Sequence, residues 1–335
     1  MSVYEHIKVL LPAGIGTLLA FVTIIACATS ASAQSVPNEA DSISASAALS
    51  SAQSTPAPKP DRDPSAAGTP EGSSSALSAS ELAKEISNPV TELWQLQFQF
   101  NNEKLESGNF NPESGKWVNN LYFQPVLPVS LTNDLNLVTR PVITLYQSVP
   151  HPTATGSSER TTTFGDMILA QVLSPANTEP WIWGVGPTWI FPTAGSDFNG
   201  QGKWQVGPAA GGGYITDKFM IAALVQQWWS FAGDADRKHT NQVSILPLVY
   251  RFFGEGWSVG YSGNILADWT ARGGDVWTVP IGLSLGKVIK LGILPVQVQI
   301  AGQYFAHRPE GGPEWNVQLQ LTPVIPKLIQ KTLFQ

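Results

Sequence analysis

The stretch WTVPIGLSLG at residues 277–286 decides the fold class of this chain. Every odd-numbered position in it carries a large apolar residue, whereas the even-numbered positions carry Thr, Pro, Gly or Ser. Side chains of a β-strand point alternately to opposite faces of a sheet, so the stretch predicts a strand with one wholly apolar face. Residues 296–301 and 315–322 repeat the alternation, with Gln or Asn at most positions of the second face.

Alternating segments of about ten residues recur from Leu93 to the C-terminus, and no apolar run there is long enough for a membrane-spanning helix. This pattern predicts an all-β fold, a transmembrane up-and-down antiparallel β-barrel of about 12 strands. The expected strands are 93–101, 117–128, 135–147, 164–173, 181–191, 204–216, 219–231, 241–252, 256–269, 276–287, 294–306 and 315–324.

The connections between these strands alternate between short and long, as in outer-membrane barrels, whose two ends carry loops of different length. The long ones are 102–116, 148–163, 192–203, 232–240, 270–275 and 307–314. Tryptophans fall near the strand ends, where their amphipathic rings suit the lipid headgroup level. The expected aromatic girdle is Trp117, Trp189, Trp204, Trp229, Trp257, Trp269, Trp277 and Trp315.

The composition also favours a wall in contact with lipid. Only 13% of the residues are charged, against about 25% in an ordinary soluble domain. The net charge of -6 offers no basic surface for a phosphate backbone, so nucleic acid is not an expected partner. A soluble secreted β-sandwich that acts as a binding module stays an alternative, although its polar faces would normally carry many Lys, Glu and Asp.

The N-terminal third divides by composition. Residues 1–33 hold an apolar run and the small-x-small sequence Ala31-Ser32-Ala33, which predicts a signal peptide cleaved after Ala33. An uncleaved anchor and a lipoprotein signal ending at Cys27 are the alternatives. Residues 34–77 are mostly Ser, Ala and Pro and predict a disordered linker. The resulting location is the bacterial cell outer membrane, after export.

A short helix is expected over residues 78–89, before a barrel at residues 90–335. Ser78 and Glu81 have capping-box spacing, and Asn88-Pro89 ends the apolar face formed by Leu82 and Ile86. The helix is about two turns long.

Polar side chains on the presumed inner face are mostly neutral amides, which provide hydrogen bonds without a ring of charge. The expected lumen residues are Gln124, Arg140, Gln171, Gln205, Gln226, Asn264, Asp268, Gln297, Gln299, Gln303, Gln318 and Gln320. Glycines at 184, 186, 282 and 286 are expected to leave space inside. The same amides could instead bond to one another across a filled lumen, and twelve strands lie between the filled and the open barrels.

No catalytic residue, metal site or cofactor is expected. A hydrolase would need a nucleophile with a base in reach, and no Ser or Asp near a strand end has a His that the alternation brings close. His151, His239 and His307 fall on the long-loop side and are interpreted as solvated loop residues.

Several short motifs in combination resemble a family of outer-membrane proteins named for a phenol-degradation (meta) pathway, whose members are often labelled transporter. The motifs are WGVGP at 183–187, FPTA at 191–194, GKW at 202–204, WSFAGD at 229–234, WTVP at 277–280 and GGPEW at 311–315. The resemblance covers about three quarters of the chain, from Ser87 onward. It implies a barrel and passage of small molecules, and it carries over no catalytic residue.

Two functions therefore stand beside each other for a membrane barrel. The first is passive or facilitated passage of small neutral or aromatic solutes, of unknown identity. The alternative is a non-transporting anchor, whose linker or loops bind cell-wall polymer or a partner. The oligomeric state is not predicted by either.

Overall fold

The structure is a computed structural model that describes residues 77–106, 117–153, 158–176, 179–327, 329 and 332–333. The predicted signal peptide lies outside the described residues, as does the linker up to residue 76. Residues from Leu77 onward form one compact unit. In this unit, no helix among the described residues is both long and apolar enough to cross a bilayer.

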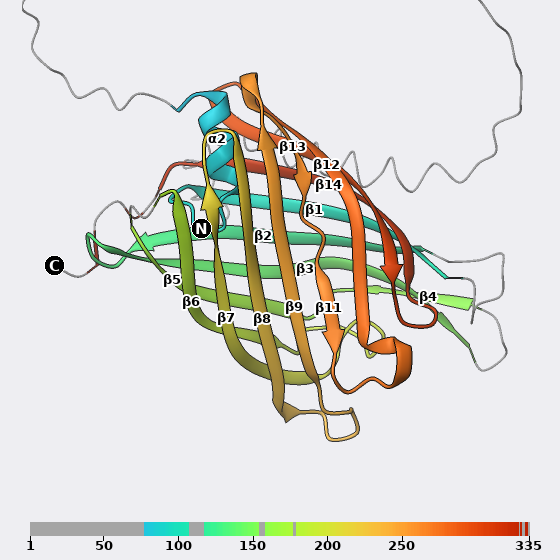
Figure 1. The fold of residues 1–335 in the computed structure, drawn as a ribbon. Helices are drawn as coiled ribbons and strands as arrows, with labels where there is room; N and C mark the ends of the chain where they lie inside the picture. Colours follow the sequence, from blue (N-terminus) through green and yellow to red (C-terminus); the bar gives the residue numbers. More distant parts are fainter. Residues whose placement is uncertain are drawn as a thin grey trace, which may run out of the picture. The chain divides into compact units, whose positions relative to one another are not determined.

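The unit is an antiparallel β-barrel with a short helix at one end (Figure 1). The helix is α2 (Ala79–Ser87). The strand segments are β1 (Trp94–Leu105), β2 (Trp117–Ser130), β3 (Leu135–Pro152), β4 (Ser158–Thr163), β5 (Met167–Pro175), β6 (Trp181–Phe191), β7 (Lys203–Ile215), β8 (Phe219–Gly233), β9 (Asn241–Phe252), β10 (Trp257–Tyr261), β11 (Ile265–Asp268), β12 (Trp277–Leu291), β13 (Leu294–His307) and β14 (Pro313–Ile325). Two 3₁₀ turns are η2 (Gly254–Gly256) and η3 (Gly273–Val276).

Fourteen segments among the described residues make twelve barrel strands. One half of β3 pairs with β4 and the other half with β5, so β4 and β5 are successive parts of one strand. In the same way, β10 and β11 both pair with β9 and with β12. The last strand, β14, pairs with β1 and closes the sheet. The predicted all-β, twelve-stranded closed barrel is confirmed.

Two stretches differ from the sequence prediction. Residues 148–152 and 158–163, expected within one long loop, pair with each other as the end of β3 and β4, as far as Pro152 and Ser158. The sequence of β4 is Ser, Glu, Arg and Thr, which lacks the apolar alternation that marked the other strands. The strand expected at 256–269 is interrupted at residues 262–264, between β10 and β11.

The outward face of the barrel exposes large aliphatic side chains. Leu283 is 63% exposed, Val317 is 58% exposed and Ile300 is 55% exposed, and all three lie within strands. An ordinary soluble surface rarely holds so many adjoining apolar side chains without a partner or a membrane. The outer wall is thus suited to contact hydrocarbon.

Aromatic rings lie toward the strand ends on this outer face. Seven of the eight tryptophans expected in the girdle are exposed, and Trp189 is partly buried. At the short-turn end, Trp257 has the Lys287 ammonium 4.7 Å from its ring centroid. Trp181, which the sequence analysis did not include, packs edge-on against Tyr214 at the same end, with 4.9 Å between ring centroids.

The two ends of the barrel are built differently (Figure 1). Short turns such as 216–218 and 292–293 lie at the end that carries α2. The connections 192–202, 234–240 and 269–276 lie at the opposite end, together with η3. This arrangement agrees with the predicted alternation of short and long loops.

Candidate functional site in the barrel lumen

One side of the lumen is lined by side-chain amides. The inner-facing residues of the adjoining strands β13, β14, β1 and β2 are mostly Gln and Asn, and strand pairing brings them into rows such as Gln299, Gln320 and Gln99. We call these residues the amide wall. Its members are Gln95, Gln97, Gln99, Asn101, Asn120, Gln124, Gln297, Gln299, Gln303, Asn316, Gln318 and Gln320.

Hydrogen bonds between neighbouring amides orient this wall. Gln124 Nε2 donates to Gln99 Oε1 at 2.9 Å, and Gln99 Nε2 donates to Asn101 Oδ1 at 3.3 Å. Asn316 Nδ2 donates to Gln303 Oε1 at 3.2 Å. Other polar atoms of the wall, including Gln297 Nε2 and Asn120 Oδ1, are buried without a protein partner. The wall therefore keeps capacity to bond a solute or water.

The opposite side of the lumen is apolar. Toward the short-turn end of β5 to β9, the inner-facing positions are mostly alanine, valine, leucine, isoleucine and glycine, and strand pairing places Leu224 between Gly211 and Leu246. Polar inner residues of these strands, such as Thr188 and Gln226, lie nearer the long-loop end. We call the larger of the apolar residues the apolar wall. Its members are Ala170, Val172, Ile182, Ala209, Ala222, Leu224, Leu246 and Leu248.

Two cavities lie along these walls, and the first is bordered by the amide wall and also by Leu246 and Leu248 of the apolar wall. This first one, the amide cavity, has about 670 Å³ of empty space, part of it open to solvent, and its lining includes Gln97, Gln299 and Gln318. The other, the apolar cavity, is smaller and is lined by residues such as Val172 and Leu224. Among the described residues, Arg140 and Pro89 line both cavities.

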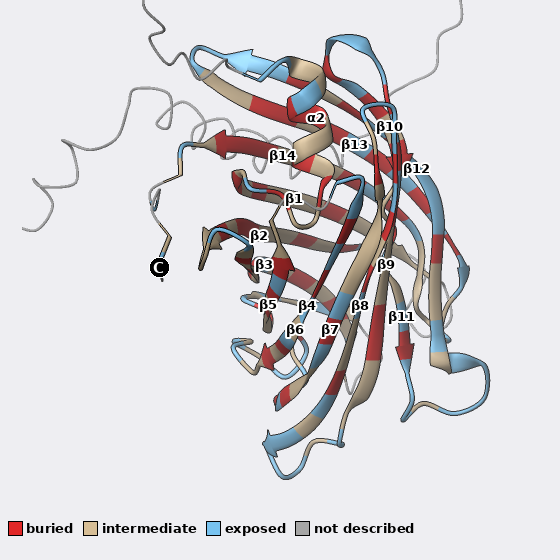
Figure 2. Ribbon diagram, turned by 60° about the vertical axis from the view of Figure 1, so that its left-hand side comes forward, coloured by how far each residue is buried: buried red, intermediate tan, exposed pale blue. Residues whose placement is uncertain are grey.

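Helix α2 occupies the barrel opening at the short-turn end (Figure 2). The structure contains the expected capping box: Ser78 Oγ accepts from Glu81 N at 3.2 Å, and the Glu81 carboxylate accepts from Ser78 N at 2.7 Å. The buried face of the helix carries Leu82, Ala83 and Ile86. These pack in one apolar cluster with inner-facing barrel residues, which are Ile182, Ile215, Met220, Ala222, Leu248, Tyr250, Phe252, Val288 and Val324.

Phe252 lies at the short-turn end of β9, but it does not belong to the outer aromatic residues. Its partner in the ladder, Ser258, is buried, and Phe252 itself is buried in the α2 cluster. The ring therefore serves the docking of α2 and not the headgroup level.

The last residues of α2 and the turn that follows it contribute to the lining of both cavities. Ile86 to Pro89 lines the amide cavity, and Pro89 and Val90 line the apolar cavity. Asn88 Oδ1 accepts from the Val90 amide at 3.0 Å and fixes the turn. We refer to residues 79–90 as the plug, because they pack on the inner face at the short-turn end and contribute to the lining of both cavities.

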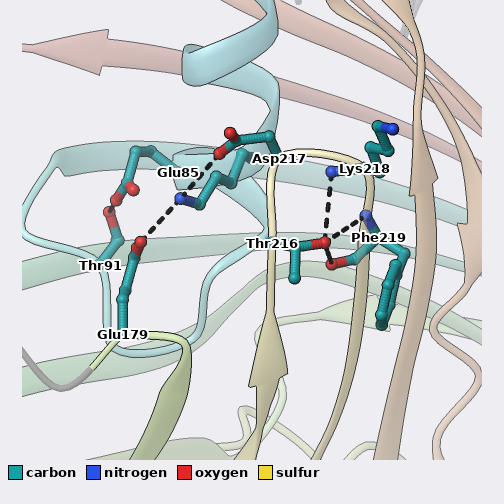
Figure 3. A network of polar contacts seen from close by, with 8 residues as sticks. Glu85, Thr91, Glu179, Thr216, Asp217, Lys218 and Phe219 are labelled. Atoms are coloured by element: carbon teal, nitrogen blue, oxygen red, sulfur yellow. Dashed lines mark hydrogen bonds and ion pairs between the residues drawn. The ribbon is translucent and has the colours of Figure 1, made fainter.

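Polar contacts hold the plug to the short turns (Figure 3) and to the amide wall. The Lys84 ammonium lies 2.8 Å from Glu179 Oε2 and 3.4 Å from Asp217 Oδ1. Gln95 Nε2 donates to the Glu85 carbonyl at 3.3 Å, and Thr91 Oγ1 donates to the Glu85 carboxylate at 3.0 Å. Burial raises the pKa of the Glu85 carboxyl, partly offset by the Thr91 hydrogen bond.

Most of the expected lumen residues lie on the inner face. Gln124, Arg140 and the five glutamines of β13 and β14 belong to or adjoin the amide wall. Gln226 Oε1 accepts from Thr188 at 2.9 Å, and Asn264 Oδ1 accepts from Ser244 at 2.6 Å. Gln205 is fully buried and bonds Gln201 and Gln242 near the long-loop end.

Gln171 is an exception. It pairs with Thr139, whereas the inner-facing Arg140 pairs with Ala170, so Gln171 faces outward and its predicted side is wrong. Asp268 shares the inner register of Gln242 but lies exposed at the long-loop end. There its carboxylate accepts from the Thr270 hydroxyl at 2.6 Å and caps a local turn.

Sequence reasoning missed the glutamines of β1. Gln95, Gln97 and Gln99 alternate with Leu96, Phe98 and Phe100, so the period of two already marked them as one face. It also missed Glu103 and Tyr122, which share the inner register with Gln99. Among the described residues, Glu103 forms no ion pair.

Gly186 and Gly282 were expected to leave space in the lumen, but they have a different role. A Cβ at Gly186 would lie 1.9 Å from the Gln171 carbonyl oxygen, and one at Gly282 would lie 2.1 Å from the Gly302 carbonyl oxygen. Their role is to let adjacent backbones approach. Side chains larger than glycine would disturb strand pairing there before they narrowed the lumen.

No group of three or more His, Cys, Asp or Glu side chains is placed to share a metal ion within the described part of the chain. His151 stacks on Phe198 with 3.7 Å between ring centroids, and its Nε2 lies 2.9 Å from Thr161 Oγ1. His307 Nδ1 lies 2.9 Å from the Trp277 carbonyl oxygen. Both rings thus have structural contacts near the long-loop end.

Comparison with protein-family models finds no match, and comparison with curated proteins finds none. Among solved structures, the chain is similar to the COG4313 outer membrane channel from Pseudomonas putida F1, with 14% identity, TM-score 0.48 and coverage of 70% of this chain and 94% of that chain. It is also similar to the NanC porin (9% identity, TM-score 0.42, 70% and 99%) and the CymD monoaromatic hydrocarbon channel (11% identity, TM-score 0.37, 72% and 91%). All three TM-scores are below 0.5, so the residues of this chain carry the functional argument.

Proposed function

We propose that this chain is a channel of the bacterial outer membrane that gives passage to small neutral or aromatic solutes. The observation that carries the proposal is the lumen itself, in which an amide wall and an apolar wall face each other inside a closed barrel. Amides supply hydrogen bonds without an electrostatic barrier, and the apolar wall supplies a surface for a ring. The exposed aliphatic outer face supports insertion in a bilayer.

The orientation follows from loop length. In outer-membrane barrels short turns face the periplasm and longer loops face the outside. The plug would then close the periplasmic end, and the segment that leads into it would lie in the periplasm. Solute would enter from the long-loop end and reach both cavities before it met the plug.

Export is part of this proposal. We expect a mature protein that begins at Gln34, because Ala31-Ser32-Ala33 fits a signal-peptidase site. Mass spectrometry of the mature N-terminus checks this expectation. A protein that keeps Met1, or one that begins with a lipidated Cys27, would contradict it.

Reconstitution tests passage directly. The full chain is folded into lipid vesicles, and swelling is measured with a small sugar and with benzyl alcohol as neutral solutes. We expect slow but measurable swelling in the unmodified protein and faster swelling when Leu82→Asp undocks the plug. Folding of each sample is verified by its heat-dependent mobility in gels.

The plug is also the observation that favours the alternative, a non-transporting anchor. An anchor would keep its lumen closed permanently, and its plug would serve stability alone. Absence of swelling in both the unmodified chain and the Leu82→Asp variant, with folding shown in each, would rule out the channel and leave the anchor. An enzyme is not proposed. Contrary to the expectation from sequence, a serine near a strand end does have a histidine close by, since Ser230 Oγ lies 3.3 Å from His239 Nδ1, but this contact is exposed at the long-loop end and lines neither cavity.

A further inference from the structure

Arg140 is placed unlike any other charged residue of the lumen. It projects from β3 between the two walls and lines both the amide cavity and the apolar cavity. Among the described residues, no carboxylate lies within ion-pair distance of its guanidinium. The inner-facing Glu103 lies four residues beyond Gln99 on β1, which is roughly 13 Å along a strand.

One edge of the guanidinium is fixed and another is free. Arg140 Nη2 donates to Gln124 Oε1 at 2.9 Å, and Gln124 in turn donates to Gln99, so a chain of amides holds the guanidinium in place. Arg140 Nε is buried without a partner, and Gln297 Nε2, in the lining of the same amide cavity, is also a buried donor without a partner. Buried donors of this kind cost free energy unless an acceptor reaches them.

The chemistry of these donors selects the acceptor. An arginine fork suits the two oxygens of a carboxylate, and bonds to a charged group are stronger than those between neutral groups. A single uncompensated positive charge matches a monoanion. On the other side of Arg140, the apolar cavity is bordered by Val138, Ala170 and Leu224, which offer contact to an apolar body and no polar group.

We infer that Arg140 forms a binding site for small aromatic monocarboxylates, with the carboxylate on the guanidinium and the ring against the apolar wall. The inference rests on the proposed function and narrows its aromatic solutes to those that carry one negative charge. It assigns the amide wall a second role, since Gln124 positions the guanidinium that the solute meets.

Binding is measured by titration calorimetry on the full chain in detergent micelles. The probes are benzoate, its neutral analogue benzamide, the cation benzylammonium, and acetate, which has the carboxylate without the ring. We expect benzoate to bind about 10- to 100-fold more tightly than benzamide, the range that a hydrogen bond to a charged group provides. Acetate is expected to bind more weakly than benzoate, because it has no ring to place on the apolar wall.

Variants locate the site. Arg140→Gln should remove the preference of the protein for benzoate over benzamide, and Arg140→Lys should retain part of it, because a lysine keeps the charge but not the fork. Arg251→Gln is the matched control, since Arg251 faces outward beside Phe253 and should leave binding unchanged. If Arg140→Gln does not fold, Arg140→Lys and the comparison of probes on the unmodified protein still decide the question.

The outcomes separate this inference from the proposed function. Equal binding of benzoate and benzamide by the folded protein, or binding of neither, would overturn the carboxylate site, whether or not vesicles swell with neutral solutes. Benzoate binding that depends on Arg140 without any swelling would support the site and contradict passage. A preference for benzoate that persists in Arg140→Gln would place the anion elsewhere and also overturn the inference.

Discussion

The two walls of the lumen share the same antiparallel backbone pairing, but they differ in the side chains that point inward. On β1 and β14, amides point inward and apolar residues point outward, as in Gln99 beside Phe98 and Gln320 beside Leu321. On β5 to β8 the inner positions toward the short-turn end are also apolar, as in Ala170 and Leu224. A strand with two apolar faces resembles a buried strand of a soluble protein more than a strand that lines a water-filled pore.

The difference between the two walls explains which inner surface the plug packs against. Leu82 and Ile86 belong to one apolar cluster with inner residues such as Leu248, whereas the polar residues that follow, Ser87 and Asn88, border the amide cavity next to Ile86. A water-filled lumen lined by amides on all sides would give an amphipathic helix nothing to bury. The apolar wall thus supplies both a surface for rings and a docking site for the plug, and the two uses compete for neighbouring surface.

The largest expected effect comes from a charge on the side of α2 that docks on the apolar wall. Leu82→Asp should weaken docking by about 3–5 kcal/mol, because leucine packing is lost and an unpaired carboxylate is buried. Such a change shifts the ratio of closed to open plug by more than about 100-fold. Single-channel recording should show longer and larger openings. Ser87→Asp is the matched control, since Ser87 faces the amide cavity, and equal effects of both variants would contradict the two-sided docking.

The strands that carry the amide wall have an inner face of amides and an outer face of apolar residues. Ile300 and Gln299 are adjacent on β13, and they face outward and inward respectively. Ile300→Arg, near the middle of its strand, should destabilise the barrel in lipid by about 2–4 kcal/mol, whereas Gln299→Arg should cost less. Folding titrations in vesicles measure both. Equal costs would favour a soluble barrel.

The periodicity of two was sufficient to predict the number of barrel strands and, within a few residues, their positions. The failures have physical causes. The hairpin formed by β3 and β4 carries polar side chains such as Thr161 and Thr162, so it lacks the apolar face that reveals a strand. Gln171 was assigned inward because it is polar, but on a strand with two apolar faces polarity does not identify the side.

The lumen was predictable in part. Glutamines that alternate with large apolar residues were assigned correctly on β13 and β14, where the outer face is unambiguous. The docking of α2 was not predictable, because its capping box and its apolar face define a helix but not the surface that covers it. That Arg140 has no carboxylate partner among the described residues is seen only in the three-dimensional structure, because a sequence pattern does not show which side chains surround it.

A smaller effect is expected when the two walls are made alike. Leu224→Gln places an amide on the apolar wall, where Ala170, Val172 and Ile182 offer no side-chain hydrogen bond. The unmet amide should cost about 1–3 kcal/mol of stability and reduce passage of benzyl alcohol relative to a small sugar. Gln318→Leu makes the reverse change on the amide wall and should shift the ratio of swelling rates the other way. Identical shifts in both variants would show that the walls do not act separately.

The smallest expected effect is a dependence of plug docking on pH. Burial raises the pKa of the Glu85 carboxyl, and nearby Glu179 and Glu92 act in the same direction, while the Thr91 hydroxyl and Lys84 oppose them. The Glu85 carboxyl therefore holds its proton more tightly when the plug is docked than when it is undocked. Docking should be strongest below the ordinary carboxyl pKa and should weaken as pH rises through the raised value. Open probability in bilayers should increase over that window, and Glu85→Gln, which stays neutral, should make the profile flat. An unchanged profile in Glu85→Gln would assign the dependence to another group, and a profile that falls with pH would contradict the docked position of Glu85.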